Sequence, residues 1–124
     1  MTRTILVVDD AEICRDAMEV TFGQLPNMAV HAVETAEQAL DFLAIENICA
    51  LVTDVHLPRM DGFELVAAVR ALPSFASLPI LVISGDTDPT TPARLAQAGA
   101  NAYFTKPYSP AAVCSKLEQL VNDI

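Results

Sequence analysis

Short apolar runs alternate with longer segments of helical periodicity along the whole of this chain. Three of the runs, ILVV, ALV and ILVI, contain only apolar residues, as expected of strands that helices cover on both faces. The five expected strands are residues 5–8, 29–33, 50–53, 80–83 and 102–104. This alternation predicts an α/β fold, a doubly wound (βα)5 three-layer sandwich around a five-stranded parallel sheet with right-handed crossovers.

Residues that cap helices precede the helical segments. Thr35 and Gln38 have the spacing of a capping box, and so have Asp61 and Glu64. Proline follows the expected cap of the last two helices, where the first turn needs no backbone N–H. The expected starts are Asp10 or Ala11, Thr35, Asp61, Asp88 and Ser109, and the first, second and fourth helices are expected to end at Leu25-Pro26, Glu46 and Gly99.

The composition fits one domain and argues against two classes of partner. The 124 residues are 52% hydrophobic and 19% charged, which suits a single domain over residues 1–124. A net charge of −9 argues against direct contact with nucleic acid, because binding to phosphates needs cationic side chains. No apolar run approaches the roughly 20 residues that span a bilayer, and no secretory signal is recognisable, so we expect a cytoplasmic protein without membrane contact.

Chemically active side chains collect directly after the apolar runs. They are Asp9 and Asp10 after the first run, Asp54 after the third, Ser84 after the fourth and Lys106 after the fifth. In open α/β sheets the ligand crevice lies beyond the carboxyl ends of the strands, where the strand order reverses. In the flavodoxin-like order 2-1-3-4-5 the first and third strands are neighbours. The three acids are therefore expected to meet in one pocket beside the serine and the lysine.

Three carboxylates in one pocket repel one another unless a cation lies nearby. Oxygen ligands without histidine or cysteine side chains favour Mg²⁺ or Mn²⁺. A carboxylate is also a nucleophile toward phosphorus and forms an aspartyl phosphate. We therefore expect phosphoryl capture, with the cation, Lys106 and Ser84 each binding one phosphoryl oxygen. A purely structural alternative, in which Asp10 only caps a helix, explains neither Asp9 nor Asp54.

Four motifs resemble those of the receiver domains of two-component signalling. They are VVDD at 7–10, TDVHLPRMDG at 53–62, ISG at 83–85 and YFTKP at 103–107. The resemblance covers essentially the whole chain and implies that Asp54 accepts the phosphoryl group. Ser84 and Lys106 would then bind the phosphoryl oxygens. The implied metal ligands are Asp10, Asp54 and the backbone carbonyl of His56, with Asp9 acting largely through water.

The same resemblance implies a conformational switch. Ser84 corresponds to the switch hydroxyl and Tyr103 to the switch aromatic residue. Gly85 corresponds to the small residue that keeps the phosphate pocket open, and Lys106-Pro107 to a peptide bond that is usually cis. On phosphorylation, Ser84 would move toward the phosphoryl group and Tyr103 would turn into the space that it leaves.

The implied function is signalling rather than turnover of a substrate, so we do not expect an enzyme. The phosphoryl donor would be a sensor histidine kinase or a histidine phosphotransfer protein, and the chain would catalyse only its own phosphorylation and dephosphorylation. The implied output face is the fourth helix, fifth strand and fifth helix, roughly residues 90–121, which would bind a downstream protein. Because the last helix uses up the C-terminus, we expect no output domain on this chain.

Three other functions share this topology. An aspartyl-nucleophile phosphatase generally has a second Asp two residues after the first, where this chain has His56. A flavin-binding module would have a hydroxyl- and glycine-rich loop after the first strand, where this chain has Asp9 and Asp10. A degenerate receiver would act as a protein-interaction module without phosphorylation, and the complete acid set opposes that reading.

Two positions are individual to this chain. We expect His56, two residues after Asp54, and Asp86, two residues after Ser84, to border the mouth of the pocket. There they would tune how readily water reaches the phosphoryl group, unless both are ordinary exposed loop residues. His31, on the second expected strand, should lie far from the pocket and be structural.

Overall fold

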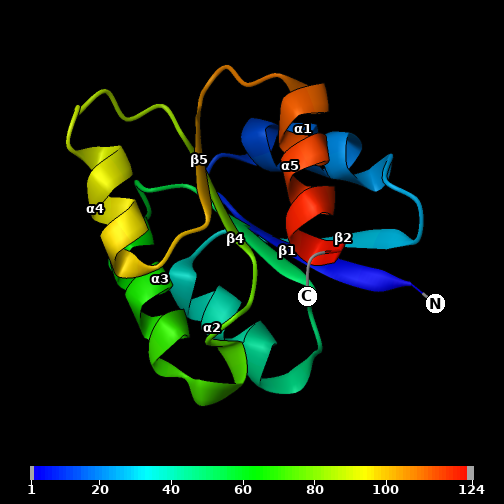
Figure 1. Cartoon of the computed structure of the whole chain (residues 1–124), viewed down its shortest axis with the longest axis horizontal. Helices are drawn as coiled ribbons and strands as arrows, with labels where there is room; N and C mark the ends of the chain where they lie inside the picture. The colour runs from blue at the N-terminus through cyan, green and yellow to red at the C-terminus, as the bar shows by residue number, and fades with distance from the viewer. Residues whose placement is uncertain (1, 123–124) are drawn as a thin grey trace.

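The five apolar runs form one parallel sheet in the computed structural model, which describes residues 2–122 (Figure 1). The sheet order is β2-β1-β3-β4-β5, and each neighbouring pair runs parallel. The predicted α/β fold and strand order are therefore confirmed. The strands are β1 (Arg3–Val8), β2 (Met28–Val33), β3 (Ala50–Thr53), β4 (Ile80–Ser84) and β5 (Ala102–Thr105).

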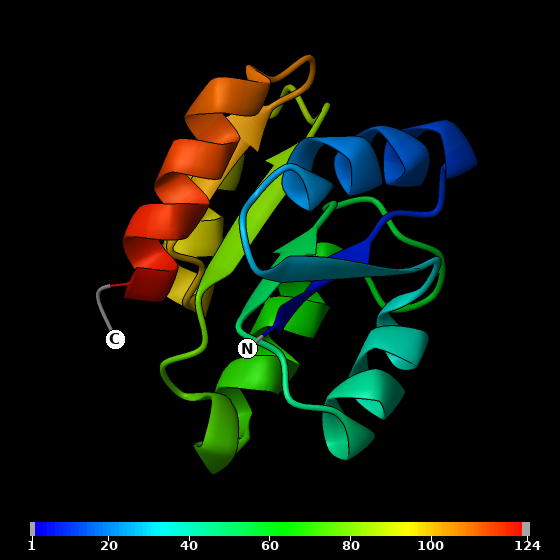
Figure 2. The same cartoon turned by 90° about the vertical axis from the view of Figure 1, so that its right-hand side faces the viewer.

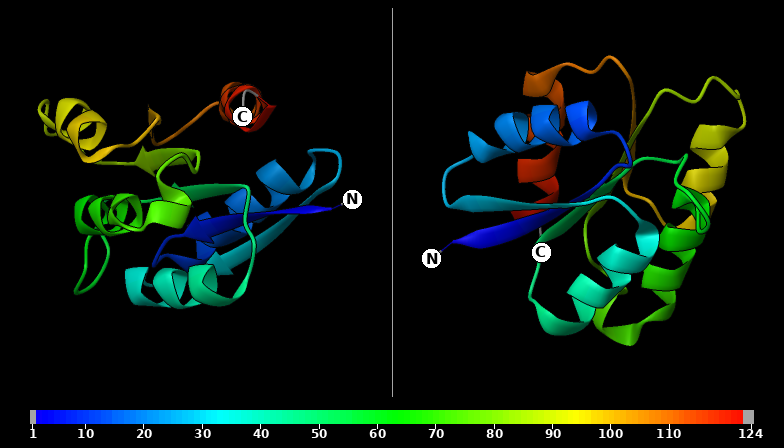
Figure 3. Two further views of the ribbon diagram at one scale, coloured as in Figure 1. Left: turned by 60° about the horizontal axis from the view of Figure 1, so that its bottom comes forward. Right: turned by 180° about the vertical axis from the view of Figure 1, so that it is seen from behind.

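Helices cover both faces of the sheet and make the three layers visible in Figures 2 and 3. One face packs against α1 and α5, and the other against α2, α3 and α4. Alternate residues of β1 serve the two layers, since Ile5 and Val7 belong to the first core and Leu6 and Val8 to the second. The helices are α1 (Glu12–Gly23), α2 (Ala36–Ile45), α3 (Gly62–Ala71), α4 (Thr91–Ala98) and α5 (Pro110–Asn122).

Both predicted capping boxes are present. The side chains of Thr35 and Asp61 each accept a hydrogen bond from the backbone N–H three residues on, and the side chain of that third residue accepts one from the backbone N–H of the cap. Ser109 also accepts a hydrogen bond from a backbone N–H of the first turn of α5. Gly99 ends α4 in the left-handed conformation, with φ 114°. Local signals of this kind therefore located most helix ends.

The start of α1 agrees with one of the two predicted positions. Its first helical residue is Glu12 with Ala11 as the N-cap, and it ends at Gly23, short of the predicted Leu25-Pro26. The Asp9 carboxylate, not that of Asp10, accepts the hydrogen bond from the Ala11 N–H, at 3.0 Å. Asp10 is therefore not the cap of this helix, and its exposed side chain is free of that role.

The start of α4 was predicted wrongly. Asp88 does not cap the helix, because its carboxylate accepts hydrogen bonds from both the N–H and the hydroxyl of Thr90. Its carbonyl accepts a bond from the Thr91 N–H, which makes a turn before the helix. Pro92, rather than Pro89, therefore lies in the first helical turn. A short 3-10 helix, η1 (Pro73–Phe75), was not predicted.

No helix among residues 2–122 has both the length and the apolar character that crossing a bilayer requires.

Gly62 lies where the loop after β3 meets the start of α3. An added Cβ there would stand 2.3 Å from the Asp54 carbonyl oxygen and 2.7 Å from the Val55 Cα. Both are backbone atoms that cannot rotate away, so we expect Gly62→Ala to lower the free energy of unfolding by about 3 kcal/mol. Urea denaturation measures this change.

Gly23→Ala is the matched control for that substitution. Nothing lies within 4 Å of a Cβ built at Gly23, and this glycine is in the last turn of α1. There alanine is expected to be neutral or to stabilise the protein by up to about 1 kcal/mol. Equal stability of the Gly62→Ala protein and the unsubstituted protein would contradict the close approach.

Candidate functional site

The carboxyl ends of the central strands bring the predicted site residues together. β1 pairs with β3 so that Val8 lies beside Thr53, and the Asp54 N–H donates to the Val8 carbonyl at 3.0 Å. At the other side, the Lys106 N–H donates to the Ser84 carbonyl at 3.0 Å. The residue that follows each strand is thereby held at the same edge of the sheet.

The three predicted acids form one cluster. An oxygen atom from each of Asp9, Asp10 and Asp54 lies within 4.8 Å of the other two. Asp9 is fully buried and Asp54 is nearly so, whereas Asp10 is exposed. Three carboxylate oxygens at this spacing, with one side open to solvent, fit a hard divalent cation such as Mg²⁺, which binds carboxylates and keeps several waters. The cluster is therefore a candidate metal centre.

Lys106 compensates the charge of the two buried acids. Its Nζ lies 2.6 Å from Asp9 Oδ2 and 3.0 Å from Asp54 Oδ2. Burial acts to lower the pKa of Lys106, but the hydrogen bonds and negative charges of Asp9 and Asp54 outweigh it and raise the pKa above its ordinary value of 10.5. The lysine is thus cationic at neutral pH and lies where a phosphoryl oxygen on Asp54 would need a positive charge.

Asp54 is held as an ionised carboxylate. Burial acts to raise its pKa, but the Ser84 hydroxyl, Lys106 and the Val55 N–H outweigh burial, so the pKa lies below its ordinary value of 3.8. Asp54 Oδ1 accepts hydrogen bonds from the N–H groups of Val55 and His56, at 2.6 and 3.3 Å. These bonds fix the orientation of the carboxylate. An oriented, ionised carboxylate is what nucleophilic attack on phosphorus requires.

The two residues singled out at the mouth of the pocket contact each other. His56 Nε2 lies 3.2 Å from Asp86 Oδ2, so their side chains bridge the loops that follow β3 and β4. The Asp86 N–H donates to the Ser84 hydroxyl oxygen at 3.3 Å, and the Asp86 carbonyl accepts from the Tyr103 hydroxyl at 3.2 Å. Asp86 therefore contacts both residues that the resemblance identifies as the switch.

Small and half-buried residues complete this side of the pocket. Nothing lies within 4 Å of a Cβ built at Gly85, so the space beside it is open. Tyr103 is half-buried, and burial together with the charges of Asp86 and Asp54 raises the pKa of its hydroxyl. A groove of about 410 Å³ opens here, between Asp86, Tyr103 and Lys106. The Lys106-Pro107 bond is cis, as the resemblance implied.

A second groove, of about 380 Å³, borders the pocket on its other side. It lies between α1 and the loop after β5, and Lys106 lines it together with Ile13 and Tyr108. Ile13 is 80% exposed, and Val20, two helical turns further along α1, is 66% exposed. Most residues that line the groove are apolar, including Ile13, Ala17 and Pro110, and a continuous apolar surface rimmed by polar residues is typical of surfaces that bind another protein.

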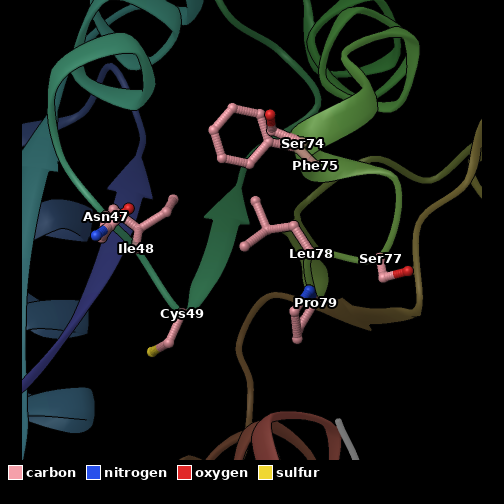
Figure 4. Close-up of a pocket in the computed structure, with 8 residues that line it drawn as sticks. All are labelled: Asn47, Ile48, Cys49, Ser74, Phe75, Ser77, Leu78 and Pro79. Carbon is pink, nitrogen blue, oxygen red and sulfur yellow. The ribbon is translucent and has the colours of Figure 1, made fainter.

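Two features of the chain lie away from the site. The His31 ring stacks on Phe42 with ring centroids 4.0 Å apart, so this histidine joins β2 to α2, as expected of a structural residue. A hollow of about 310 Å³ lies at the opposite edge of the sheet (Figure 4), where the lining includes Cys49, Phe75 and Leu78. None of the clustered acids lines it.

Sequence reasoning missed one residue of this region. Thr91 is fully buried, and its hydroxyl donates to Asp86 Oδ2 at 3.1 Å. It was missed because the helix was expected to begin earlier, which placed Thr91 in the interior of a helical segment. A threonine in the first turn of a helix that follows an acidic loop is the signal that could have indicated it.

The chain is similar to known proteins along nearly its whole length. The family model of the response regulator receiver domain matches residues 5–118. A chemotaxis protein CheY homolog of Campylobacter jejuni is 32% identical over 119 residues, which cover 95% of this chain and 92% of the relative. A putative response regulator from Chloroflexus aurantiacus has a solved structure with a TM-score of 0.92 at 29% identity, covering 98% of this chain and 99% of that one.

A further solved structure is that of the chemotaxis response regulator CheY4 of Vibrio cholerae. It is 26% identical to this chain, with a TM-score of 0.87, and the match covers 97% of this chain and 99% of that one.

Proposed function

This chain belongs to the response regulator receiver family of two-component signalling, and from that premise we propose that it is a switch that accepts a phosphoryl group on Asp54. The observation that carries the proposal is the setting of Asp54. Its ionised carboxylate lies within 4.8 Å of the Asp9 and Asp10 oxygens and 3.0 Å from Lys106 Nζ. A nucleophile, a metal centre and a fixed cation at one point are the parts that phosphoryl transfer needs.

The proposed reaction is one displacement at phosphorus. The Asp54 carboxylate attacks the phosphorus of a phosphohistidine, an O–P bond forms as the P–N bond breaks, and the electron pair of that bond goes to the imidazole. Backbone N–H groups of Val55 and His56 orient the attacking carboxylate. Lys106 neutralises charge on a phosphoryl oxygen, and the Ser84 hydroxyl donates to another. The chain has no further substrate in this proposal, so it is not an enzyme in the usual sense.

The acid cluster is proposed to bind Mg²⁺, or Mn²⁺ in its place. The cation would be held by Asp10, Asp54 and the His56 carbonyl, and Asp9 would contact it largely through water. This division agrees with burial, because Asp9 already pairs with Lys106 whereas Asp10 is exposed. When bound, the cation supplies positive charge to a phosphoryl oxygen.

The partners are proposed from chemistry and position. The donor is a sensor histidine kinase or a histidine phosphotransfer protein, and we place its contact on the apolar groove beside α1, because Lys106 lines both that groove and the acceptor pocket. The output face comprises α4, β5 and α5, where Tyr103 connects the surface to the Asp86 carbonyl. The switch is proposed to work in the cytoplasm, where nucleotide-dependent kinases act.

The test of this function uses acetyl phosphate as a small donor. Incubation with Mg²⁺ should add the mass of one phosphoryl group, and the adduct should be absent when a chelator is added. A protein that gains no adduct would be a degenerate receiver that only binds partners. Steady release of phosphate from an added ester would favour a phosphatase instead, and a yellow protein would favour a flavin module.

The His56–Asp86 bridge gives a prediction for the lifetime of the adduct. Because the bridge crosses the mouth of the pocket, His56→Ala and Asp86→Ala should each admit water more readily and shorten the phosphoryl lifetime several-fold. Lifetimes are measured by mass spectrometry after removal of acetyl phosphate. His31→Ala, at the other histidine, serves as the control and should leave the lifetime unchanged. Unchanged phosphoryl lifetimes in both bridge variants would contradict a role of His56 and Asp86 in limiting the access of water.

A further inference from the structure

Asp86 joins the acceptor pocket to the first turn of α4. Its Oδ2 accepts a hydrogen bond from the Thr91 hydroxyl at 3.1 Å and also lies 3.2 Å from His56 Nε2. Its Oδ1 accepts the Asp88 N–H at 2.7 Å. The Asp86 side chain is only 11% exposed, so these bonds have little competition from water.

The Thr91 hydroxyl makes the side-chain hydrogen bond to Asp86 that holds the beginning of α4 to the pocket. Thr91 is fully buried, and Thr90, the residue before the helix, makes no side-chain cap. Further along α4, Leu95 is buried in the core, Arg94 stacks over the Phe63 ring of α3 at 4.0 Å, and Gly99 caps the end. Arg94 lies at the end of the first turn, and Leu95 and Gly99 belong to the second turn and its cap. The side-chain hydrogen bond between the first residue of the helix and the loop after β4 is the Thr91–Asp86 bond.

A phosphoryl group on Asp54 would act on Asp86 in two ways. It replaces the single negative charge of the Asp54 carboxylate by the about −1.5 to −2 charges of the phosphoryl group, so the pocket that the Asp86 carboxylate borders becomes more negative and the Asp86 carboxylate is repelled. It also attracts the Ser84 hydroxyl, whose oxygen now accepts the Asp86 N–H at 3.3 Å. The first effect moves the Asp86 side chain and the second moves its backbone. Both therefore displace the Asp86 carboxylate, which accepts the hydrogen bond from Thr91.

We propose that Thr91 is a positioning residue that holds α4 in its unphosphorylated place through Asp86, and that phosphorylation releases the helix by breaking the Thr91–Asp86 bond. This inference rests on the proposed function. It identifies the first contact between the acceptor pocket and the α4 part of the output face. The contact needs an acid and a buried hydroxyl, which Asp86 and Thr91 supply in this chain.

Hydrogen exchange of the α4 amides tests the proposal. In the unsubstituted protein, acetyl phosphate with Mg²⁺ should speed exchange in α4 by roughly tenfold, the effect of losing one hydrogen bond to a charged group. Thr91→Val removes the hydroxyl and keeps the shape, so its α4 should exchange at the faster rate before phosphorylation and change little afterwards. Thr91→Ser keeps the hydroxyl and should behave like the unsubstituted protein. Exchange in α2 is the internal reference and should not change.

The outcomes distinguish a failure of the proposed role of Thr91 from a failure of the proposed phosphorylation of Asp54. The intact mass of each sample reports whether Asp54 carries the phosphoryl group. An adduct without faster exchange in α4, or a Thr91→Val protein whose α4 exchanges as slowly as that of Thr91→Ser, would overturn the role of Thr91 and leave the acceptor standing. Absence of any adduct would instead overturn the proposed function. If Thr91→Val does not fold, Asp86→Ala replaces it, because this substitution removes the acceptor of the same hydrogen bond. Its α4 should also exchange at the faster rate before phosphorylation.

Discussion

Asp54→Asn is expected to abolish phosphorylation by acetyl phosphate while leaving the fold intact. The amide has nearly the same shape as the carboxylate, and its oxygen can still accept the Val55 N–H, which now donates to Asp54 Oδ1 at 2.6 Å. It is no longer an anionic nucleophile, and it removes one of the clustered acids from the candidate metal centre. Intact mass after incubation with Mg²⁺ should show the full adduct on the unsubstituted protein and none on the variant.

The control for this experiment is an acid outside the cluster. Asp16→Asn changes an exposed carboxylate on α1 and should leave the yield of adduct unchanged. Asp10→Asn should lower the rate and raise the Mg²⁺ concentration needed, without abolishing the adduct, because Asp54 remains. An adduct of undiminished yield on the Asp54→Asn protein would show that the acceptor lies elsewhere in the chain.

Lys106→Met is expected to cause the largest loss of stability of any substitution at the site. Asp9 is fully buried, and Lys106 Nζ is 2.6 Å from it and 3.0 Å from Asp54. Removing the cation leaves two neighbouring carboxylates without a compensating charge, which costs about 3–5 kcal/mol for a buried pair. Urea denaturation in the presence of chelator should show this loss. Saturating Mg²⁺ should restore part of it, because a cation bound only by the folded protein stabilises that state.

The pH dependence of this loss is a separate signature. The pKa of Lys106 is raised, so its contribution to stability is fully present below the ordinary value of 10.5 and is lost as pH rises through the higher folded value. The pKa of Asp54 is lowered, so its contribution is present above the ordinary value of 3.8 and is lost as pH falls through the lower folded value. The difference in stability between the two proteins should be nearly constant between these limits and shrink outside them.

Lys116→Met, on α5, provides the matched control. Lys116 forms no ion pair with the acid cluster, and its substitution should change the free energy of unfolding by about 0.5 kcal/mol or less at any pH in this range. If Lys106→Met were as stable as Lys116→Met in chelator, the buried acids would not need this lysine for charge compensation. Such a result would also weaken the assignment of Lys106 as the phosphoryl-binding cation.

The strands were predictable because their signal is local. A run such as ILVI has no polar face, and a strand without a polar face must be covered on both sides, which in a single chain requires helices between the strands. The structure buries every residue of β4 (Ile80–Ser84). Capping boxes at Thr35 and Asp61 are likewise contained within four residues, and both were located correctly.

The errors arose where two local signals competed. Asp88 followed by Pro89 has the pattern of a cap and a first-turn proline. The Asp88 carboxylate instead takes both the N–H and the hydroxyl of Thr90, which closes a turn and delays the helix to Thr91. The following proline, Pro92, then fits the first turn as well as Pro89 would have. The hydrogen bonds from Thr90 to Asp88 therefore distinguish the two registers.

The amino-acid sequence alone determined the order of strands and helices and the chemistry available at each strand end, because both follow from the types of neighbouring residues. The tertiary structure decided which group each site residue contacts. Lys106 pairs with Asp9 across 97 positions of the chain, and Asp86 joins His56 of one loop to Thr91 of a helix. Such bonds depend on the distance and direction between separate loops, which the packing of the layers sets and which no local pattern contains.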